Sequence, residues 1–150
     1  MGRRNVAQAQ RITLTPIGHV ERDERDAELA GDELRARPAR IVLDPALTDG
    51  LLGLEPGSDV VVLFYFHQSA GYDLQLHPRG DPSRPLRGVF ATRSQHRPNP
   101  IGVTVARVRC IAGNVLEVVG LDALDGSPVL DVKVYASYFD ASYVNTSGER

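Results

Sequence analysis

A loop with two prolines, in residues 88–103 (GVFATRSQHRPNPIGV), constrains the fold of this chain more than any other stretch. Pro98 and Pro100 each fix their own φ and push Arg97 and Asn99 toward extended backbone, so neither a helix nor a central strand can continue here. Apolar alternation on both sides predicts that one core strand enters the loop and another leaves it. We therefore expect a rigid connection of the kind that often carries binding residues, with a solvated turn as the alternative.

The length of 150 residues suits one domain, which we place at residues 11–140 between flexible tails at 1–10 and 141–150. No apolar run reaches the length of a membrane span, and the first residues do not form a secretion signal. The single cysteine, Cys110, lies in an apolar alternating stretch and is expected to be buried, which fits a reducing cytoplasm.

Charge is distributed unevenly along the chain, although the net charge is only −2. Residues 77–97 hold five arginines and two histidines against Asp81 alone, whereas residues 21–33 hold seven acids against two arginines. A local basic face of this kind can contact phosphate at one site on a mildly acidic protein. A solvated charged surface is the alternative interpretation.

The hydrophobic pattern predicts a mainly β protein with one short helix. Residues 59–66 (DVVVLFYF) are the most apolar run and are expected to form a central strand buried on both faces. Strands at 101–111 and 115–121 are joined at Gly113-Asn114, a favourable tight-turn pair. Closely spaced strands favour a mainly antiparallel β-barrel or a similar closed β domain. We also expect strands at 11–20, 40–43 and 72–76, a helix that begins at Asp44-Pro45 and ends near Gly53, and a long surface loop at 21–39.

The last strand, VLDVKVY, shows the clearest spacing in the sequence. Because side chains alternate across a strand, Leu130, Val132 and Val134 are expected on one face, which would be the core. The other face would carry an aliphatic, an acid, a cation and a phenol. This second row is either an exposed strand face or a row of ligand-contacting groups, and its members are Val129, Asp131, Lys133 and Tyr135.

Several common site types lack their sequence mark. Four histidines and one cysteine occur without the spacing of metal ligands, so we expect no metal site. No P-loop or G-x-G-x-x-G fingerprint appears, which argues against a Rossmann fold. His67 and Gln68 follow the central strand, where a histidine more often makes structural hydrogen bonds than serves in a site.

Three motifs together resemble those of the TrmO (TsaA-like) family. They are TRS-x-x-RPNPIG at 92–102, FYFHQ at 64–68 and LDGSPVLDVKVY at 124–135. The resemblance implies a non-Rossmann β-barrel methyltransferase that works as a homodimer with S-adenosylmethionine as methyl donor. It implies that the substrate is tRNA carrying threonylcarbamoyladenosine beside the anticodon, and that the methyl acceptor is N6. No membrane or metal is implied.

The resemblance also assigns roles to matching residues. The donor would be contacted by His67, Gln68, Arg93, Val103, Asp122, Ala123, Leu124 and Asp125. The transferred methyl group or the RNA would be near Arg97, Asn99, Asp131, Lys133 and Tyr135. Lys133 would act as a base or hold the threonyl carboxylate, and we favour the second role because the N6 hydrogen of a ureido group is relatively acidic.

One segment departs from the family pattern, and it leaves the acceptor open. After Ile17-Gly18 the family continues toward Arg-Ser-Pro-Tyr/Phe-Lys, whereas this chain reads HVERD at 19–23, an acidic segment expected to repel phosphate. The family's longer members also have a C-terminal region beyond the third motif. The alternatives are therefore a methyltransferase acting on another RNA or a small molecule, a non-catalytic nucleotide- or RNA-binding β domain, and a plain structural domain.

Overall fold

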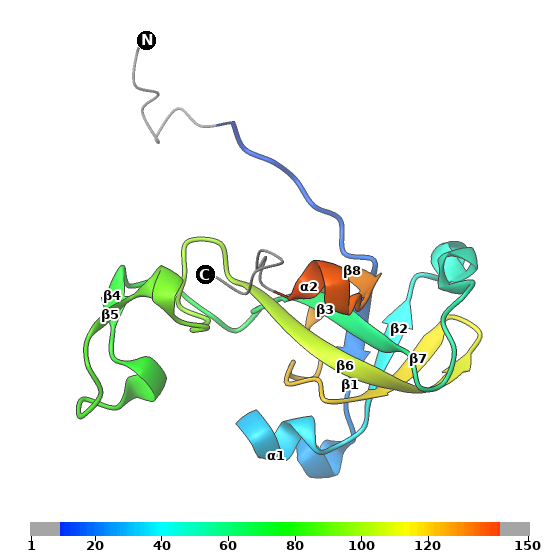
Figure 1. Cartoon of the computed structure of the whole chain (residues 1–150), viewed down its shortest axis with the longest axis horizontal. Coiled ribbons are helices and arrows are strands. Elements are labelled where there is room, and N and C mark those ends of the chain that lie inside the picture. The colour runs from blue at the N-terminus through cyan, green and yellow to red at the C-terminus, as the bar shows by residue number, and fades with distance from the viewer. Residues whose placement is uncertain (1–9, 142–150) are drawn as a thin grey trace, which may run out of the picture.

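Six strands form a closed antiparallel barrel, as predicted (Figure 1). The structure is a computed structural model that describes residues 10–141, so all but one residue of each predicted tail lies outside the described residues. The strand order around the barrel is β1-β2-β7-β6-β3-β8, and β8 closes it against β1. The strands are β1 (Gly18–Glu21), β2 (Ala39–Leu43), β3 (Asp59–Tyr65), β6 (Ile101–Ala112), β7 (Val115–Val119) and β8 (Pro128–Val134).

A small lobe projects from the barrel between β3 and β6, and it is drawn in green in Figure 1. Its two-stranded sheet pairs β4 (Gln75–Leu76) with β5 (Arg87–Gly88). Two 3-10 helices, η4 (Pro78–Gly80) and η5 (Val89–Ala91), complete it. The two-proline loop therefore joins this lobe to β6, and the prediction that it connects two core strands is wrong. The strand predicted at 72–76 is reduced to the two residues of β4.

Strand β3 is buried on one face. Val60, Val62 and Phe64 are buried in the core, whereas Val61 and Leu63 are half-buried on the outer face. The prediction of burial on both faces is therefore wrong. The physical reason is closure: a barrel strand has one face inside, and its outer face stays in contact with solvent unless another layer covers it.

A bulge in β8 changes the predicted alternation of the last strand. Phe64 of β3 pairs with Val129, but Leu63 pairs with Asp131, so the extra residue between them has no partner. Val129 consequently faces the core and is fully buried, and Val132 packs against the core as well. The prediction that Val129 shares a face with Asp131 is wrong, because a bulge shifts the inward positions by one residue.

The first part of the chain is more ordered than predicted. Regular pairing begins only at Gly18, so the strand predicted at 11–20 is shorter and later than expected. The segment predicted as a surface loop contains the 3-10 helix η2 (Glu24–Asp26) and the helix α1 (Gly31–Arg35). Its apolar anchor is Leu34, which is buried. Helix α1 is held by tertiary contacts, which a local sequence pattern does not reveal.

The other local predictions are mostly confirmed. The predicted helix after Asp44 is the 3-10 helix η3 (Pro45–Leu51), whose start is capped by that aspartate accepting from the N–H of Ala46. The β6–β7 hairpin turns at Gly113, which has φ +58°. Cys110 is exposed, contrary to prediction, because the β6–β7 register shifts beside it. The C-terminal element is α2 (Ser137–Asp140), and within residues 10–141 no helix is both long and apolar enough to cross a membrane.

Candidate functional site

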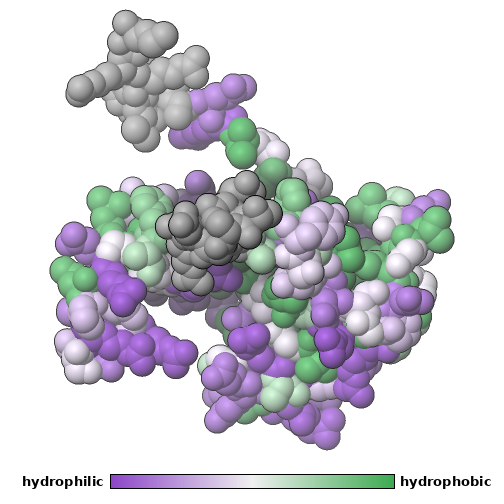
Figure 2. All heavy atoms as spheres, in the orientation of Figure 1, coloured by the Kyte–Doolittle hydropathy of each residue, from purple (hydrophilic) through white to green (hydrophobic). Residues whose placement is uncertain are grey.

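A cavity of about 940 Å³ lies where the first half of β6 has an unpaired edge. Strand β6 pairs with β3 along Ile101–Arg107, but β7 joins its other edge only from Arg107 onward. The lobe, the helix α1 and the turn after β7 surround this open edge, and Figure 2 shows the hollow between lobe and barrel. The lining residues are Gly31, Asp32, Arg35, Phe64, Phe66, Arg79, Arg93, Arg97, Asn99, Ile101, Gly102, Val103, Thr104, Val105 and Asp122.

A smaller cavity of about 240 Å³ continues the first one toward the end of β3. The two cavities share Gly31, Phe64, Phe66 and Asp122 in their linings, so together they form one site, which we call the seam cavity. The smaller part adds residues from the end of β3 and from the turn after β7, which are His67, Gln68, Ala123 and Leu124.

Two phenylalanine rings form the apolar wall of the seam cavity. The centroids of Phe64 and Phe66 are 5.2 Å apart with an interplanar angle of 77°, the edge-to-face arrangement that aromatic pairs favour. Gly102 makes this packing possible, because a Cβ at that position would lie 2.5 Å from Cζ of Phe64. A glycine is therefore required where β6 passes the ring.

The two-proline loop is braced by its own arginines. Nη1 of Arg97 donates to the carbonyl oxygens of Thr92 and Ser94 at 3.2 and 3.1 Å. Nη2 of Arg93 donates to the carbonyl of Val103 on the open edge of β6 at 3.2 Å. Arg93 is exposed, and this bond uses only one of its five N–H donors. The remaining donors of its guanidinium are available to bind an anion.

The turn after β7 is fixed by a buried arginine that sequence analysis did not identify. Arg22 is 8% exposed, and its guanidinium donates to the carbonyl oxygens of Ala123, Leu34 and Leu121. Its backbone N–H donates to Oδ1 of Asp125 at 2.8 Å. Burial lowers the pKa of Arg22, and nearby aspartates oppose this effect. Arg22 therefore ties α1 to the turn, and both line the seam cavity.

The carboxylate of Asp122 is oriented by a hydrogen bond. Oγ1 of Thr104 donates to Oδ1 of Asp122 at 2.5 Å, which fixes the carboxylate against the first half of β6. Asp122 remains exposed and lines both parts of the seam cavity. An oriented, accessible carboxylate can accept hydrogen bonds from ligand hydroxyl or amino groups.

Most of the predicted site residues meet in this cavity. From the predicted donor set, the lining includes His67, Gln68, Arg93, Val103, Asp122, Ala123 and Leu124; from the predicted methyl or RNA set, it includes Arg97 and Asn99. Asp125 does not line the cavity and instead holds Arg22.

The remaining predicted site residues lie outside the seam cavity, on β8 and directly after it. Asp131 and Lys133 are on the outer face of β8, where Nζ of Lys133 is 2.6 Å from Oδ2 of Asp131. Tyr135 follows them, and its N–H donates to the carbonyl of Asp59. None of the three lines the seam cavity.

Several lining residues were not predicted from the sequence, although a local pattern marks two of them. Phe64 and Phe66 are two apart and so share a face, which alternation alone could have indicated. Arg79 and the helix α1 reach the cavity only through the tertiary fold, and no local pattern marks them. Among residues 10–141, no group of three or more histidine, cysteine, aspartate or glutamate residues is placed to hold a metal ion.

This combination defines a class: a small closed antiparallel β-barrel with a cavity along the unpaired half of β6, without Rossmann topology. A family profile for the tRNA-methyltransferase O N-terminal domain matches residues 23–141. The chain belongs to this TrmO family, which confirms the resemblance read from the three motifs.

Individual relatives agree with this assignment. A probable S-adenosyl-L-methionine-binding protein of Methanocaldococcus jannaschii is 36% identical over 85% of this chain and 94% of its own length. A tRNA (adenine(37)-N6)-methyltransferase of Mus musculus is 42% identical over 61% of this chain and 21% of its own length. The name of the first relative agrees with the cofactor predicted from the sequence.

Solved structures show the same fold. A crystal structure of TrmO superposes with a TM-score of 0.69 at 35% identity and covers 92% of this chain. TrmO from Pseudomonas aeruginosa gives a TM-score of 0.67 at 31% identity and covers 94% of this chain. The chain spans 64% of the length of each of these two solved structures.

Proposed function

We propose that this protein is an S-adenosylmethionine-dependent methyltransferase that acts on N6 of threonylcarbamoyladenosine beside the anticodon of tRNA. The observation that carries the proposal is the convergence of nine predicted site residues, from three separate segments, on the seam cavity of a TrmO-family barrel. The mouse relative, named for methylation of adenine N6 at position 37 of tRNA, supports the same acceptor.

The lining of the seam cavity fits S-adenosylmethionine chemically. The ligand has a carboxylate, ribose hydroxyls and an adenine ring, and each has a matching group here. Arg93 can pair with the carboxylate, and Asp122 can accept from ribose hydroxyls or the adenine amine. Phe66, which is half-buried, offers apolar surface to a purine, and Phe64 packs against it from the core. When bound, S-adenosylmethionine supplies an electrophilic methyl group on its sulfonium.

The protein's own contribution is then to position the acceptor and to allow the N6 proton to leave. Nζ of Lys133 lies 2.6 Å from Oδ2 of Asp131, so in this structure the lysine already contacts a carboxylate, the kind of group that we expect it to bind in the substrate. We infer that it holds the threonyl carboxylate of the substrate. The N6 hydrogen belongs to a ureido group and needs less help to leave than that of a simple amine. Alignment is the main task left to the enzyme.

Lys133 and its neighbours would reach a cavity through a second copy of the chain. The outer face of the β6-β3-β8 sheet is apolar and exposed, with Tyr65 40%, Ile101 38% and Val105 43% accessible. Asp131 and Lys133 border this face, which joins the seam cavity at β6. We infer a homodimer through this face, in which each subunit offers its β8 row to the partner's cavity. Tyr65→Glu should shift sedimentation from dimer to monomer, and an unchanged dimer would contradict this arrangement.

The divergent acidic segment does not oppose RNA as strongly as its sequence suggests. Glu21 contacts Nε2 of His19 at 3.1 Å and Nε of Arg40 at 3.5 Å, and the bond from His19 lowers the pKa of Glu21. Asp23 accepts from the side chain of Arg25 at 2.9 Å, which lowers the pKa of Asp23. Each carboxylate therefore has a cationic or hydrogen-bonding partner, which weakens its repulsion of phosphate.

The test is nucleoside mass spectrometry of tRNA containing threonylcarbamoyladenosine after incubation with the protein and S-adenosylmethionine. We expect a methyl-mass gain on that nucleoside. Lys133→Ala should abolish the gain while calorimetry shows donor binding unchanged. Arg109→Ala is the matched control, because Arg109 is also an exposed strand cation paired with an acid, Glu117, at 3.8 Å. Unchanged turnover in Lys133→Ala would contradict the role of Lys133.

Other outcomes separate the alternative functions. Methyl transfer to a different RNA or to a small molecule would keep the donor and change the acceptor. Donor binding without transfer to any acceptor would indicate a non-catalytic binding domain. Absence of donor binding in folded protein would leave only a structural role.

A further inference from the structure

We propose that the β4–β5 lobe (residues 73–96) is a phosphate-binding site for the RNA backbone next to the target nucleoside. This inference rests on the proposed function, since it takes an RNA strand as the substrate. It adds a second subsite beside the seam cavity, in which arginines contact backbone phosphate. The lobe would bind the phosphates of the strand while the nucleoside to be methylated enters the seam cavity.

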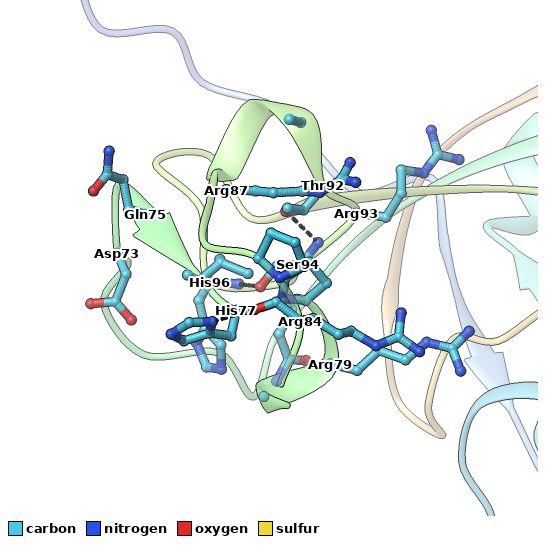
Figure 3. Close-up of a pocket in the computed structure, with 16 residues that line it drawn as sticks. Asp73, Gln75, His77, Arg79, Arg84, Arg87, Thr92, Arg93, Ser94 and His96 are labelled. Atoms are coloured by element: carbon cyan, nitrogen blue, oxygen red, sulfur yellow. Dashed lines mark hydrogen bonds between the residues drawn. The ribbon is translucent and has the colours of Figure 1, made fainter. Parts of the chain in front are cut away.

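The lobe contains a cavity of its own, of about 1070 Å³, whose lining is rich in cations (Figure 3). Four arginines and two histidines line it, together with Asp73 as the only acid in its lining. The side chains of Arg79, Arg84 and Arg93 extend from the lobe in the direction of the barrel in Figure 3. The cationic lining residues are His77, Arg79, Arg84, Arg87, Arg93 and His96.

The lobe cavity adjoins the seam cavity. Arg79 and Arg93 line both. Since Arg93 is assigned to the donor carboxylate, Arg79 is the arginine along which a bound strand would pass from one cavity to the other. In a nucleotide strand, each base is only a few bonds away from the phosphates on either side of it, so a base and its neighbouring phosphates can occupy adjacent cavities. Recognition of single-stranded RNA commonly splays one base into a pocket while neighbouring phosphates are held outside it. The shared lining provides this arrangement.

Most of the lobe arginines are not paired with acidic side chains. All four lobe arginines are exposed, and of these four only Arg84 has an acidic partner within residues 10–141, Asp81 at 3.6 Å. Unpaired arginines on a protein of net charge −2 are available to an anion, and the guanidinium fork matches phosphate oxygens. All four line the same lobe cavity, so their charge would direct the RNA to this side of the molecule.

The backbone of the lobe holds one arginine in an uncommon conformation. Arg79 has φ 57° and ψ 22°, and it is the only non-glycine residue with positive φ among residues 10–141. Left-handed backbone is unfavourable for a residue with a long side chain, and such outliers gather at binding sites. The surrounding loop is braced, because Nδ1 of His77 donates to the carbonyl of Arg84 at 2.7 Å. Asp81 also accepts from the hydroxyl of Ser83 at 2.6 Å.

The test measures affinity for fluorescein-labelled tRNA containing threonylcarbamoyladenosine by anisotropy at several salt concentrations. The variant Arg84→Ala/Arg87→Ala removes two lobe cations that do not line the seam cavity. For single strands each phosphate contact contributes about 0.7 to the slope of log K against log salt. The double variant should therefore lose about 1.4 from the slope and bind about tenfold more weakly at 0.15 M salt.

Matched variants control for charge and for folding. Arg84→Lys/Arg87→Lys keeps both charges and should retain the salt slope. Arg109→Ala removes an exposed cation on β6, outside the linings of both cavities, and should leave binding unchanged. Arg79→Gly removes the guanidinium at a backbone conformation that glycine adopts freely, so weaker RNA binding there reports on the side chain. Circular dichroism of every variant should match the wild type.

The outcomes distinguish this proposal from the proposed function. If the wild type methylates the tRNA but Arg84→Ala/Arg87→Ala binds it with unchanged affinity and slope, the lobe proposal is overturned and the function stands. If the double variant loses affinity for S-adenosylmethionine to the same extent as for tRNA, the arginines act on the donor site and the lobe proposal is again overturned. If the wild type neither binds nor methylates the tRNA, both fall.

Discussion

Replacing the buried Arg22 with methionine should destabilise the whole fold. Its guanidinium, on a residue 8% exposed, donates to the carbonyls of Ala123 at 2.9 Å, Leu34 at 3.1 Å and Leu121 at 2.5 Å. Methionine has a similar length but no donor, so the carbonyls of Ala123 and Leu121 would lose their partner, whereas that of Leu34 keeps the backbone N–H of Arg37. A buried group left without its hydrogen bond costs about 1–3 kcal/mol. Two such carbonyls give an expected loss of about 3 kcal/mol of unfolding free energy.

The assay is urea unfolding followed by circular dichroism. With a denaturant slope of about 2 kcal/mol per molar, the loss should lower the urea midpoint by about 1.5 M without changing the slope. Arg25→Met is the matched control, because the Arg25 side chain is 79% exposed and its ion pair with Asp23 lies in solvent. Arg22→Lys should fall between the wild type and Arg22→Met, since lysine can satisfy some of the carbonyls.

The result that would refute this reasoning is an Arg22→Met midpoint that moves no further than that of Arg25→Met. It would mean that water replaces the guanidinium at these carbonyls. A second consequence follows from the same geometry. Because Arg22 joins α1 to the turn that lines the seam cavity, the variant should also bind S-adenosylmethionine more weakly under conditions where it remains folded.

Three further predictions concern packing, pH and ligand binding. Gly102→Ala should destabilise the protein by about 1–3 kcal/mol in urea unfolding, because the new methyl group would overlap the Phe64 ring; Gly50→Ala, with open space around it, should not. The side chain of Arg107 hydrogen-bonds Asp59 and lowers the pKa of Asp59 below its ordinary 3.8, so this stabilisation is present above pH 4 and is lost as pH falls through the folded-state pKa. Asp59→Asn should flatten the acid limb of stability measured against pH, and an identical limb would argue against the pair. S-adenosylmethionine at about 100 times its Kd should add about 2.7 kcal/mol to stability in thermal unfolding, and an unchanged midpoint would exclude binding to the folded state.

Part of the candidate site was accessible from the sequence because its motifs are local. The two-proline loop predicts that Arg93, Arg97 and Asn99 are site residues, and the family resemblance predicts the same for His67 and the turn at 122–125. These segments do meet at the seam cavity. The sequence did not reveal Arg79, the helix α1 or the buried Arg22. Each of these contributes through contacts with residues far away in the chain, and no periodic pattern records such contacts.

The sequence by itself determined the strands β2, β3, β6, β7 and β8, the hairpin at Gly113, the capped turn at Asp44 and the barrel class, because alternation and turn chemistry are properties of neighbouring residues. Only the tertiary structure decided which side chains face inward where register changes. The bulge between Val129 and Asp131 and the register shift beside Cys110 depend on the partner strand, so local alternation gave the wrong face at both places. The open edge of β6 likewise exists because β7 is too short to cover it, and this difference in strand length creates the seam cavity.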